Sequence, residues 1–223
     1  MMLLALAICL IISVVATPFV KKLAFKINAV DRPNNRKVHK TIMPRLGGLA
    51  IIISFFIAFS IFHPDSPYFW PIVIGALIIA ATGIIDDIVE LSAKVKLLAQ
   101  FVATLIVVLS GAQISYVDLP FNITLDFGYL SIPITIIWII GVTNAINLID
   151  GLDGLAAGVS SIALLTISGL AISLGDTFVA MVGFMLLGGT VGFLFFNFYP
   201  AKIFMGDTGA LFLGFMIGVL SVL

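Results

Sequence analysis

Long apolar runs separated by short polar stretches make up most of this chain of 223 residues. Each run approaches the roughly 20 residues that an α-helix needs to cross a bilayer. The pattern predicts eight such helices, over residues 1–20, 46–63, 68–85, 97–112, 130–146, 155–173, 178–196 and 208–223. We therefore expect an all-α fold, a polytopic integral membrane helix bundle that forms a single domain over residues 1–223.

Two local patterns refine this expectation. Residues 113–129 alternate apolar and polar side chains, which predicts a short outer β-hairpin between two of the helices. Gly188 and Gly192, like Gly214 and Gly218, lie four residues apart within predicted helices. Small residues at this spacing indicate close packing of one membrane helix against another.

Charge separates along the chain in step with the predicted helices. The eleven basic residues all fall in the odd-numbered connections, and the even-numbered connections hold none. They are Lys21, Lys22, Lys26, Arg32, Arg36, Lys37, Lys40, Arg45, Lys94, Lys96 and Lys202. The positive-inside rule places these connections in the cytoplasm and the N-terminus outside. A formal net charge of zero thus conceals a dipole across the membrane, and nothing in it indicates a nucleic-acid partner.

Two polar clusters lie at predicted cytoplasmic helix ends. Asp86 and Asp87 follow one helix and precede Lys96, and adjacent carboxylates repel each other unless a cation or basic side chain lies near. The alternative is a solvated loop. Residues 144–154 hold Asn144, Asn147, Asp150 and Asp153 at every third position, which aligns them on one face of a helix. A water-filled cavity without a ligand is the alternative here, although regular amides and carboxylates suit sugar, nucleotide or metal binding better.

Two further clusters complete the set. Residues 197–209 bring Asn197, Phe204 and Asp207, although Asp207 and Thr208 would also serve as a simple helix cap. The basic loop from Asp31 to Gly48 is rich in proline, asparagine and glycine, beyond what positive-inside anchoring requires. Together the clusters bring acidic and basic side chains to one membrane face. Mg²⁺ prefers oxygen ligands and shares them with substrate phosphates, which basic side chains neutralise.

These motifs, in this order, resemble the polyprenyl-phosphate N-acetylhexosamine-1-phosphate transferase family, also called glycosyltransferase 4. The resemblance rests on Asp86-Asp87, on the Asn147-x-x-Asp150-x-x-Asp153-Gly motif and on Met-Gly-Asp207-Thr-Gly. It implies transfer of a phospho-sugar from a UDP-N-acetylhexosamine to undecaprenyl phosphate, with release of UMP and a requirement for Mg²⁺, with Mn²⁺ as the alternative ion. It also implies a bacterial cytoplasmic membrane and an active site that faces the cytoplasm.

The resemblance implies a role for each matching position. Asp207 resembles the metal ligand. The catalytic set is Asp86, Asp87, Asp150 and Lys96, with Asp86 as the residue that deprotonates the acceptor phosphate. The nucleotide-binding set is Asn147, Gly151, Leu152, Asp153, Phe204, Asn197 and Lys40, among which Gly151, Leu152, Asp153 and Phe204 match the positions that hold uracil.

Some alternatives stay open from the sequence. The pattern from Asp31 to His39 resembles the subgroup that uses UDP-N-acetylglucosamine, and transfer of phospho-N-acetylmuramoyl-pentapeptide is the alternative reaction. A cation-coupled transporter is the alternative from a different class, although the predicted spans carry almost no charge between their ends. Family members continue for further spans, so we expect the C-terminal part of the family domain to be absent from this chain. A homodimer is one of the oligomeric states that the sequence leaves open.

Overall fold

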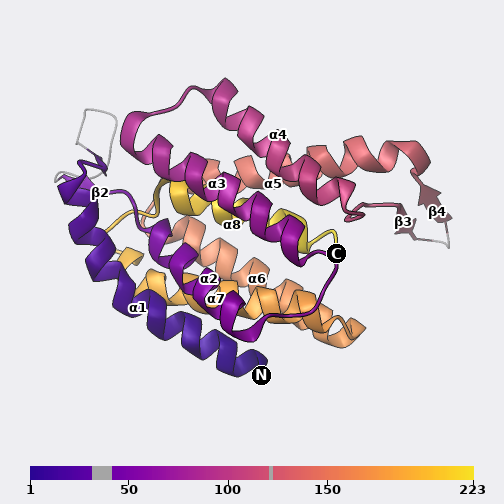
Figure 1. The fold of residues 1–223 in the computed structure, drawn as a ribbon, viewed down its shortest axis with the longest axis horizontal. Coiled ribbons are helices and arrows are strands. Elements are labelled where there is room, and N and C mark those ends of the chain that lie inside the picture. Colours follow the sequence, from indigo (N-terminus) through magenta and orange to yellow (C-terminus); the bar gives the residue numbers. More distant parts are fainter. Residues whose placement is uncertain (32–41, 121–122) are drawn as a thin grey trace.

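The computed structural model describes residues 1–31, 42–120 and 123–223. Within them the chain forms eight α-helices and two short antiparallel strand pairs (Figure 1). The helices are α1 (Met2–Lys26), α2 (Gly48–Phe62), α3 (Phe69–Val89), α4 (Ala93–Leu109), α5 (Ser131–Ile149), α6 (Leu155–Leu174), α7 (Thr177–Asn197) and α8 (Gly206–Leu220). The predicted all-α bundle and its helix order are thereby confirmed.

Five of these helices, α1, α3, α5, α6 and α7, are long and apolar enough to cross a membrane. The α2 and α8 helices are apolar but have only 15 residues each. Apolar side chains also cover much of the outer surface, for example Ile11, Phe19 and Ile162, which are each at least 60% exposed. An exposed apolar surface of this extent is typical of helices that face lipid. The chain is therefore a multi-pass membrane protein.

The centre of the bundle is α8, whose residues from Thr208 to Leu220 are all buried. It packs against α3 and α5 (Figure 1). A Cβ atom on Gly214 would lie 2.7 Å from the Thr143 Cα of α5, and one on Gly192 of α7 would lie 2.6 Å from the Leu10 carbonyl oxygen of α1. The predicted close packing at these glycines is confirmed, because any larger residue would push the helices apart.

The helix ends differ from the predicted ends in a way that matters for the site. The α3 helix continues to Val89, α4 begins at Ala93, α5 ends at Ile149 and α8 begins at Gly206. The predicted helix ends lie at the first charged residue after each apolar run, whereas a helix continues until its backbone turns or is capped. At the end of α3 this turn occurs at Glu90, which has a φ of 55°. Several polar residues that the sequence placed in loops therefore lie on rigid helical turns.

Two strand pairs complete the fold. The predicted outer hairpin is confirmed as β3 (Tyr116–Leu119) paired with β4 (Ile123–Asp126). The β1 (Val30–Asp31) and β2 (Met43–Pro44) strands form a second pair that the sequence did not predict. The segment after β2 then runs beside the segment that enters α8.

Three backbone hydrogen bonds connect these two segments. The Phe204 N–H donates to the Pro44 carbonyl at 2.8 Å, the Gly47 N–H to Phe204 at 2.9 Å, and the Gly48 N–H to Met205 at 2.8 Å. The start of α2 is thereby fixed against the start of α8.

Candidate active site

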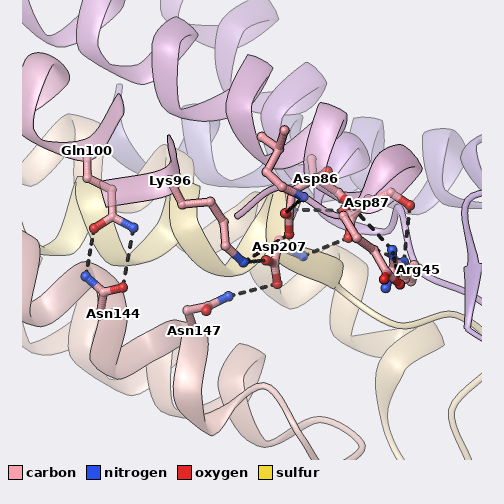
Figure 2. Close-up of polar contacts among 11 residues, drawn as sticks. Arg45, Asp86, Asp87, Lys96, Gln100, Asn144, Asn147 and Asp207 are labelled. Atoms are coloured by element: carbon pink, nitrogen blue, oxygen red, sulfur yellow. Dashed lines mark hydrogen bonds and ion pairs between the residues drawn. The ribbon is translucent and has the colours of Figure 1, made fainter. Parts of the chain in front are cut away.

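Polar side chains from α3, α4, α5 and α8 meet at one end of the bundle (Figure 2). Asp207, in the first turn of α8, lies at their centre. The Lys96 ammonium of α4 donates to Asp207 Oδ2 at 2.7 Å, and the Asn147 amide of α5 donates to Asp207 Oδ1 at 2.9 Å. The same Lys96 Nζ lies 3.1 Å from Asp86 Oδ2 of α3. Residues separated by up to 121 positions in the chain thus share one polar cluster.

Asp86 is held in place by the turn that ends α3. The Leu91 N–H donates to Asp86 Oδ1 at 2.7 Å, so the other carboxylate oxygen turns toward Lys96. Asp86 is 7% exposed. A buried carboxylate needs a cation or hydrogen-bond donors, and Lys96 and Leu91 supply both. The family resemblance implies that this group deprotonates an acceptor phosphate.

The neighbouring Asp87 points in a different direction and caps α8. Its Oδ1 accepts the Asp207 N–H at 3.0 Å, and its Oδ2 accepts the Thr208 N–H at 3.0 Å and the Thr208 hydroxyl at 2.6 Å. The first N–H groups of a helix have no partner within the helix, and negative charge at that end is favourable. Asp87 therefore joins the end of α3 to the start of α8 and fixes the backbone that carries Asp207.

Gly206 makes this close approach between α3 and α8 feasible. Its φ is +74°, a left-handed conformation that favours glycine. A Cβ atom at this position would lie 2.8 Å from Asp87 Oδ1. The glycine of the Met-Gly-Asp motif is thus required both by its backbone conformation and by the position of Asp87.

Arg45 supports the same corner, although the sequence analysis did not include it among the site residues. Its Nε donates to the Asp87 carbonyl at 3.2 Å, and its Nη2 donates to the Asp86 carbonyl and to Glu90 Oε1, both at 3.4 Å. A guanidinium at a helix C-terminus satisfies free carbonyls and offsets the helix dipole. The only sequence signal for Arg45 is its position as the last basic residue before α2.

A pair of amide side chains lies one helical turn deeper in the membrane. The Asn144 Nδ2 of α5 donates to Gln100 Oε1 of α4 at 2.7 Å, and Gln100 Nε2 donates back to Asn144 Oδ1 at 3.4 Å. Gln100 follows Lys96 by four residues and Asn144 precedes Asn147 by three, so each pair lies on one helix face. The amide pair therefore sets the register of α4 and α5 at the point where both reach Asp207 (Figure 2).

Asp150 follows the last residue of α5 and lies at the edge of this cluster. Burial raises its pKa from 3.8 to about 7, and the negative charges of Asp207 and Asp87 act in the same direction. A hydrogen bond from the Gly206 backbone acts in the opposite direction. Burial and like charges both disfavour the ionised form of a carboxylic acid. A cation bound among these groups would favour it.

Two residues of the predicted nucleotide-binding set hold loops together. Asp153 Oδ2 accepts the Ala201 N–H at 2.9 Å. The Asn197 side chain accepts the Gly154 N–H at 3.2 Å and donates to the Ile203 carbonyl at 3.0 Å. Both therefore connect the loop after α5 to the loop between α7 and α8. Their predicted contact with a nucleotide stays a prediction.

The other residues of the predicted nucleotide-binding set lie in or near these two loops, except one that falls outside the part of the chain that the structure describes. Gly151 and Leu152 are exposed in the loop after α5, and Leu152 is 60% exposed. Phe204 is half-buried beside the cluster and joins the start of α2 through its backbone. The exposed loop of Gly151 and Leu152, directly after Asp150, offers an apolar surface on which a base could pack. Lys40 lies outside the described residues.

The chemistry of the cluster fits a divalent cation shared with a ligand. Three carboxyl groups, Asp86, Asp87 and Asp207, lie beside two basic side chains, Lys96 and Arg45 (Figure 2). Asp150 lies close enough to Asp207 and Asp87 for their charges to act on it. Within the described residues no three acidic, histidine or cysteine side chains form a preorganised metal site. Mg²⁺ characteristically takes one or two carboxylates and completes its shell with water and substrate phosphates. Asp207, with Asp86 and Asp150 nearby, provides carboxylates of this kind.

Comparison with known proteins supports one family. The model of the family described as "Glycosyl transferase family 4" matches residues 69–223. The chain is 47% identical to the "Probable undecaprenyl-phosphate N-acetylglucosaminyl 1-phosphate transferase" of Bacillus subtilis (strain 168), over 98% of this chain and 62% of that relative. The chain thus spans less than two thirds of the length of this relative.

More distant relatives carry a second name. A "Phospho-N-acetylmuramoyl-pentapeptide-transferase" of Caldanaerobacter subterraneus subsp. tengcongensis is 32% identical over 92% of this chain and 69% of that relative. One of Listeria monocytogenes serovar 1/2a is 34% identical over 97% of this chain and 73% of that relative. The family match covers α3 to α8, the same helices that bring Asp86, Lys96, Asn147 and Asp207 together. This chain belongs to glycosyl transferase family 4.

Proposed function

We propose that this chain is the site-bearing part of a membrane enzyme that transfers N-acetylglucosamine 1-phosphate from UDP-N-acetylglucosamine to undecaprenyl phosphate and releases UMP. The observation that carries the proposal is the position of Asp207. It lies at the start of α8, with one oxygen bound by Lys96 and the other by Asn147, and Lys96 also contacts Asp86. The name of the Bacillus subtilis relative supports this donor and acceptor.

The reaction exchanges one phosphoanhydride bond for another. An oxygen of the acceptor phosphate attacks the phosphorus that carries the sugar, the bond from this phosphorus to the bridging oxygen breaks, and UMP leaves with that oxygen. Both reactants are anionic, so the site must reduce their repulsion and align them. Mg²⁺, with Mn²⁺ as the alternative, would be held by Asp207 and would neutralise charge on the donor diphosphate.

The side chains of the cluster take complementary parts in this scheme. Asp86 accepts a proton from the acceptor phosphate when that phosphate arrives protonated. The Lys96 ammonium lies between Asp86 and Asp207, where the substrate phosphates would arrive. It would then bind phosphate oxygens in place of the carboxylates, because an ammonium forms strong hydrogen bonds to phosphate. Asp87 and Arg45 hold the backbone, and the exposed loop at Gly151 and Leu152 receives the uracil.

The orientation in the membrane follows from charge. All seven basic residues that the structure describes lie at the end of the bundle that carries the site, or close to it: Lys21, Lys22, Lys26, Arg45, Lys94, Lys96 and Lys202. The connections at the opposite end, including the β3–β4 hairpin, carry Asp65, Asp118, Asp126 and Asp176. This distribution favours a site that faces the cytoplasm of the bacterial inner membrane, where soluble UDP-sugars are found.

Transfer of phospho-N-acetylmuramoyl-pentapeptide is the second candidate reaction, favoured by the relatives that are 32 to 34% identical. A donor panel separates the two. Membranes that contain the protein are given undecaprenyl phosphate, Mg²⁺ and either UDP-N-acetylglucosamine or UDP-N-acetylmuramoyl-pentapeptide, and UMP and lipid-linked sugar are measured. The assay is run on this chain and on a form extended by the C-terminal part of the Bacillus subtilis relative.

The proposal predicts UMP release from UDP-N-acetylglucosamine with the extended form, and loss of that release in Asp207→Asn. Asp65→Asn, the same chemical change at the opposite end of the bundle, is the matched control and should retain the wild-type rate. Absence of UMP release from every donor with the extended form, or a wild-type rate in Asp207→Asn, would refute the proposal.

A further inference from the structure

The outer hairpin carries one wholly apolar face. In the β3–β4 ladder Val117 pairs with Leu125, and Leu119 pairs with Ile123. Directly paired residues lie on the same face of an antiparallel ladder, and residues two positions apart along a strand share that face. These four side chains therefore lie together on one side of the hairpin, which we call the apolar hairpin face.

The other side of the same hairpin is polar. Tyr116 pairs with Asp126, and Asp118 pairs with Thr124. The Thr124 hydroxyl donates to Asp118 Oδ1 at 2.6 Å across the strands. Asp126 Oδ1 also accepts the Gly128 N–H at 2.8 Å, which fixes the exit of the hairpin. Two carboxylates and their partners thus hold this side toward water.

Nothing in the described residues covers the apolar hairpin face. All eight strand residues are exposed, and the four apolar side chains are 40 to 51% exposed. An isolated two-stranded hairpin is only marginally stable in water. A one-sided apolar surface on such a hairpin therefore requires a partner that removes it from water.

The position of the hairpin identifies that partner as the bilayer. The hairpin leads within two residues into the apolar span Gly128–Ile149, and the Phe127 N–H donates to the Ser115 carbonyl at 2.9 Å, which closes its base. Figure 1 shows it beyond the ends of α4 and α5, at the periphery of the bundle. Tyr129, directly after it, is 101% exposed. Tyrosine at the end of a membrane span characteristically marks the depth of the lipid headgroups.

We propose that the apolar hairpin face lies on the outer leaflet and inserts its four side chains at the boundary between headgroups and acyl chains. The exposed apolar residues Leu130 and Ile132, at the start of the span that follows the hairpin, support this occupant over a second copy of the chain. The two carboxylates on the opposite side agree with it, because the face in contact with lipid then carries no charge. The hairpin thereby fixes the depth of α5, the helix whose other end carries Asn147.

Site-directed spin labels test this arrangement. The only cysteine of the chain, Cys9, is buried, so single labels can be introduced at Leu125→Cys and Thr124→Cys. These neighbours share one strand and face opposite sides, which makes them a matched pair. Val117→Cys and Asp118→Cys form a second pair on the other strand. Unmutated protein treated with the same reagent controls for labelling of Cys9.

Each label is measured in proteoliposomes by its collision rate with oxygen, which concentrates in lipid, and with a water-soluble nickel chelate. The proposal predicts a several-fold higher ratio of oxygen to nickel collisions at positions 125 and 117 than at positions 124 and 118. Equal access of nickel to both faces would overturn it, because the hairpin would then stand in water. Low access of both reagents at 125 and 117 would also overturn it, because a protein surface would then cover this face. Neither result depends on transferase activity.

Discussion

Asp86 and Asp87 are adjacent in the sequence but have different structural roles, and the Asp87→Asn substitution separates them. Asp87 accepts three hydrogen bonds from the first turn of α8, whereas Asp86 accepts one backbone N–H and the Lys96 ammonium. We expect Asp87→Asn to destabilise the protein more than Asp86→Asn does. Asp86→Asn is thus the matched control, with the same chemical change at the neighbouring position.

The magnitude follows from the contacts. An asparagine at position 87 keeps one acceptor oxygen and turns an NH₂ group toward either the Asp207 N–H or the Thr208 N–H and hydroxyl. A hydrogen bond to a charged group contributes about 1.5–3 kcal/mol. The lost negative charge at the start of α8 contributes about 0.3–2 kcal/mol more. The sum is about 2–5 kcal/mol, which for a chain of this size lowers the unfolding temperature by about 4–20 °C.

The control variant has a smaller expected effect. Asp86→Asn removes the ion pair between the buried Asp86 carboxylate and Lys96, but Lys96 keeps its contact with Asp207, and the asparagine oxygen can still accept the Leu91 N–H. It also removes one of the like charges near Asp207. Thermal unfolding of the purified proteins in detergent, without divalent cations, measures both variants. An unfolding temperature for Asp87→Asn equal to that of the wild type, together with a clear loss in Asp86→Asn, would refute the assignment of Asp87 as the cap.

Three further outcomes follow from the same cluster. Lys96→Met should tighten Mg²⁺ binding by about tenfold in isothermal titration calorimetry, because it removes a positive charge that repels the ion, and two unit charges about 4 Å apart interact by about 1–4 kcal/mol. Lys94→Met is the control and should leave the affinity unchanged. Unchanged affinity in Lys96→Met would contradict the prediction. Gln100→Leu should cost about 1–3 kcal/mol of unfolding free energy, because Asn144 Oδ1 loses its donor and Asn144 Nδ2 keeps only the Ile140 carbonyl as its acceptor. The Gln100→Leu/Asn144→Leu double variant should cost less than the two single changes together. The folded-state pKa of Asp150 is raised from 3.8 to about 7, so ionisation of this group removes stability as the pH rises through that range. Asp150→Asn should therefore unfold at a higher temperature than the wild type at about pH 8 and lose most of this advantage near pH 4. The same pH profile of unfolding temperature in both proteins would exclude the effect.

The helix order and the outer hairpin were predictable because apolar length and alternation are properties of the local sequence. The convergence of Asp86, Asp150 and Asp207 was also predictable, since each follows or begins a span on the same membrane face. Strict parity of the basic residues supports the count of helices. Lys96, which was predicted to belong to the site, donates a hydrogen bond to Asp207.

The division of roles within the motifs was not predictable. The spacings of two adjacent aspartates to any other motif differ by only one residue, and only the tertiary approach of α3 to Gly206 shows that Asp87 caps α8 while Asp86 faces Lys96. Asn197 and Asp153 have the residue types of ligand-binding positions, but in the fold they satisfy backbone groups of facing loops. Such roles depend on which segment lies opposite, which the local sequence does not encode.

The site roles of Arg45 and Gln100 were not predictable for a related reason. Each looks ordinary at its position, a basic residue before a span and a single amide within one. Their importance comes from partners 41 to 44 residues away, the carbonyls at the end of α3 and the Asn144 side chain. A polar residue inside a predicted span was the available signal for Gln100, because buried amides in a membrane need a partner.

Binding of Mn²⁺ by the purified protein, followed by electron paramagnetic resonance in the presence of UDP-N-acetylglucosamine, tests most directly whether the converging carboxylates form a divalent cation site. The account predicts saturable binding of a single Mn²⁺ that requires Asp207 and survives Asp65→Asn at the other end of the bundle. Saturable binding that persists unchanged in Asp207→Asn, or no saturable binding in the wild type, would contradict it.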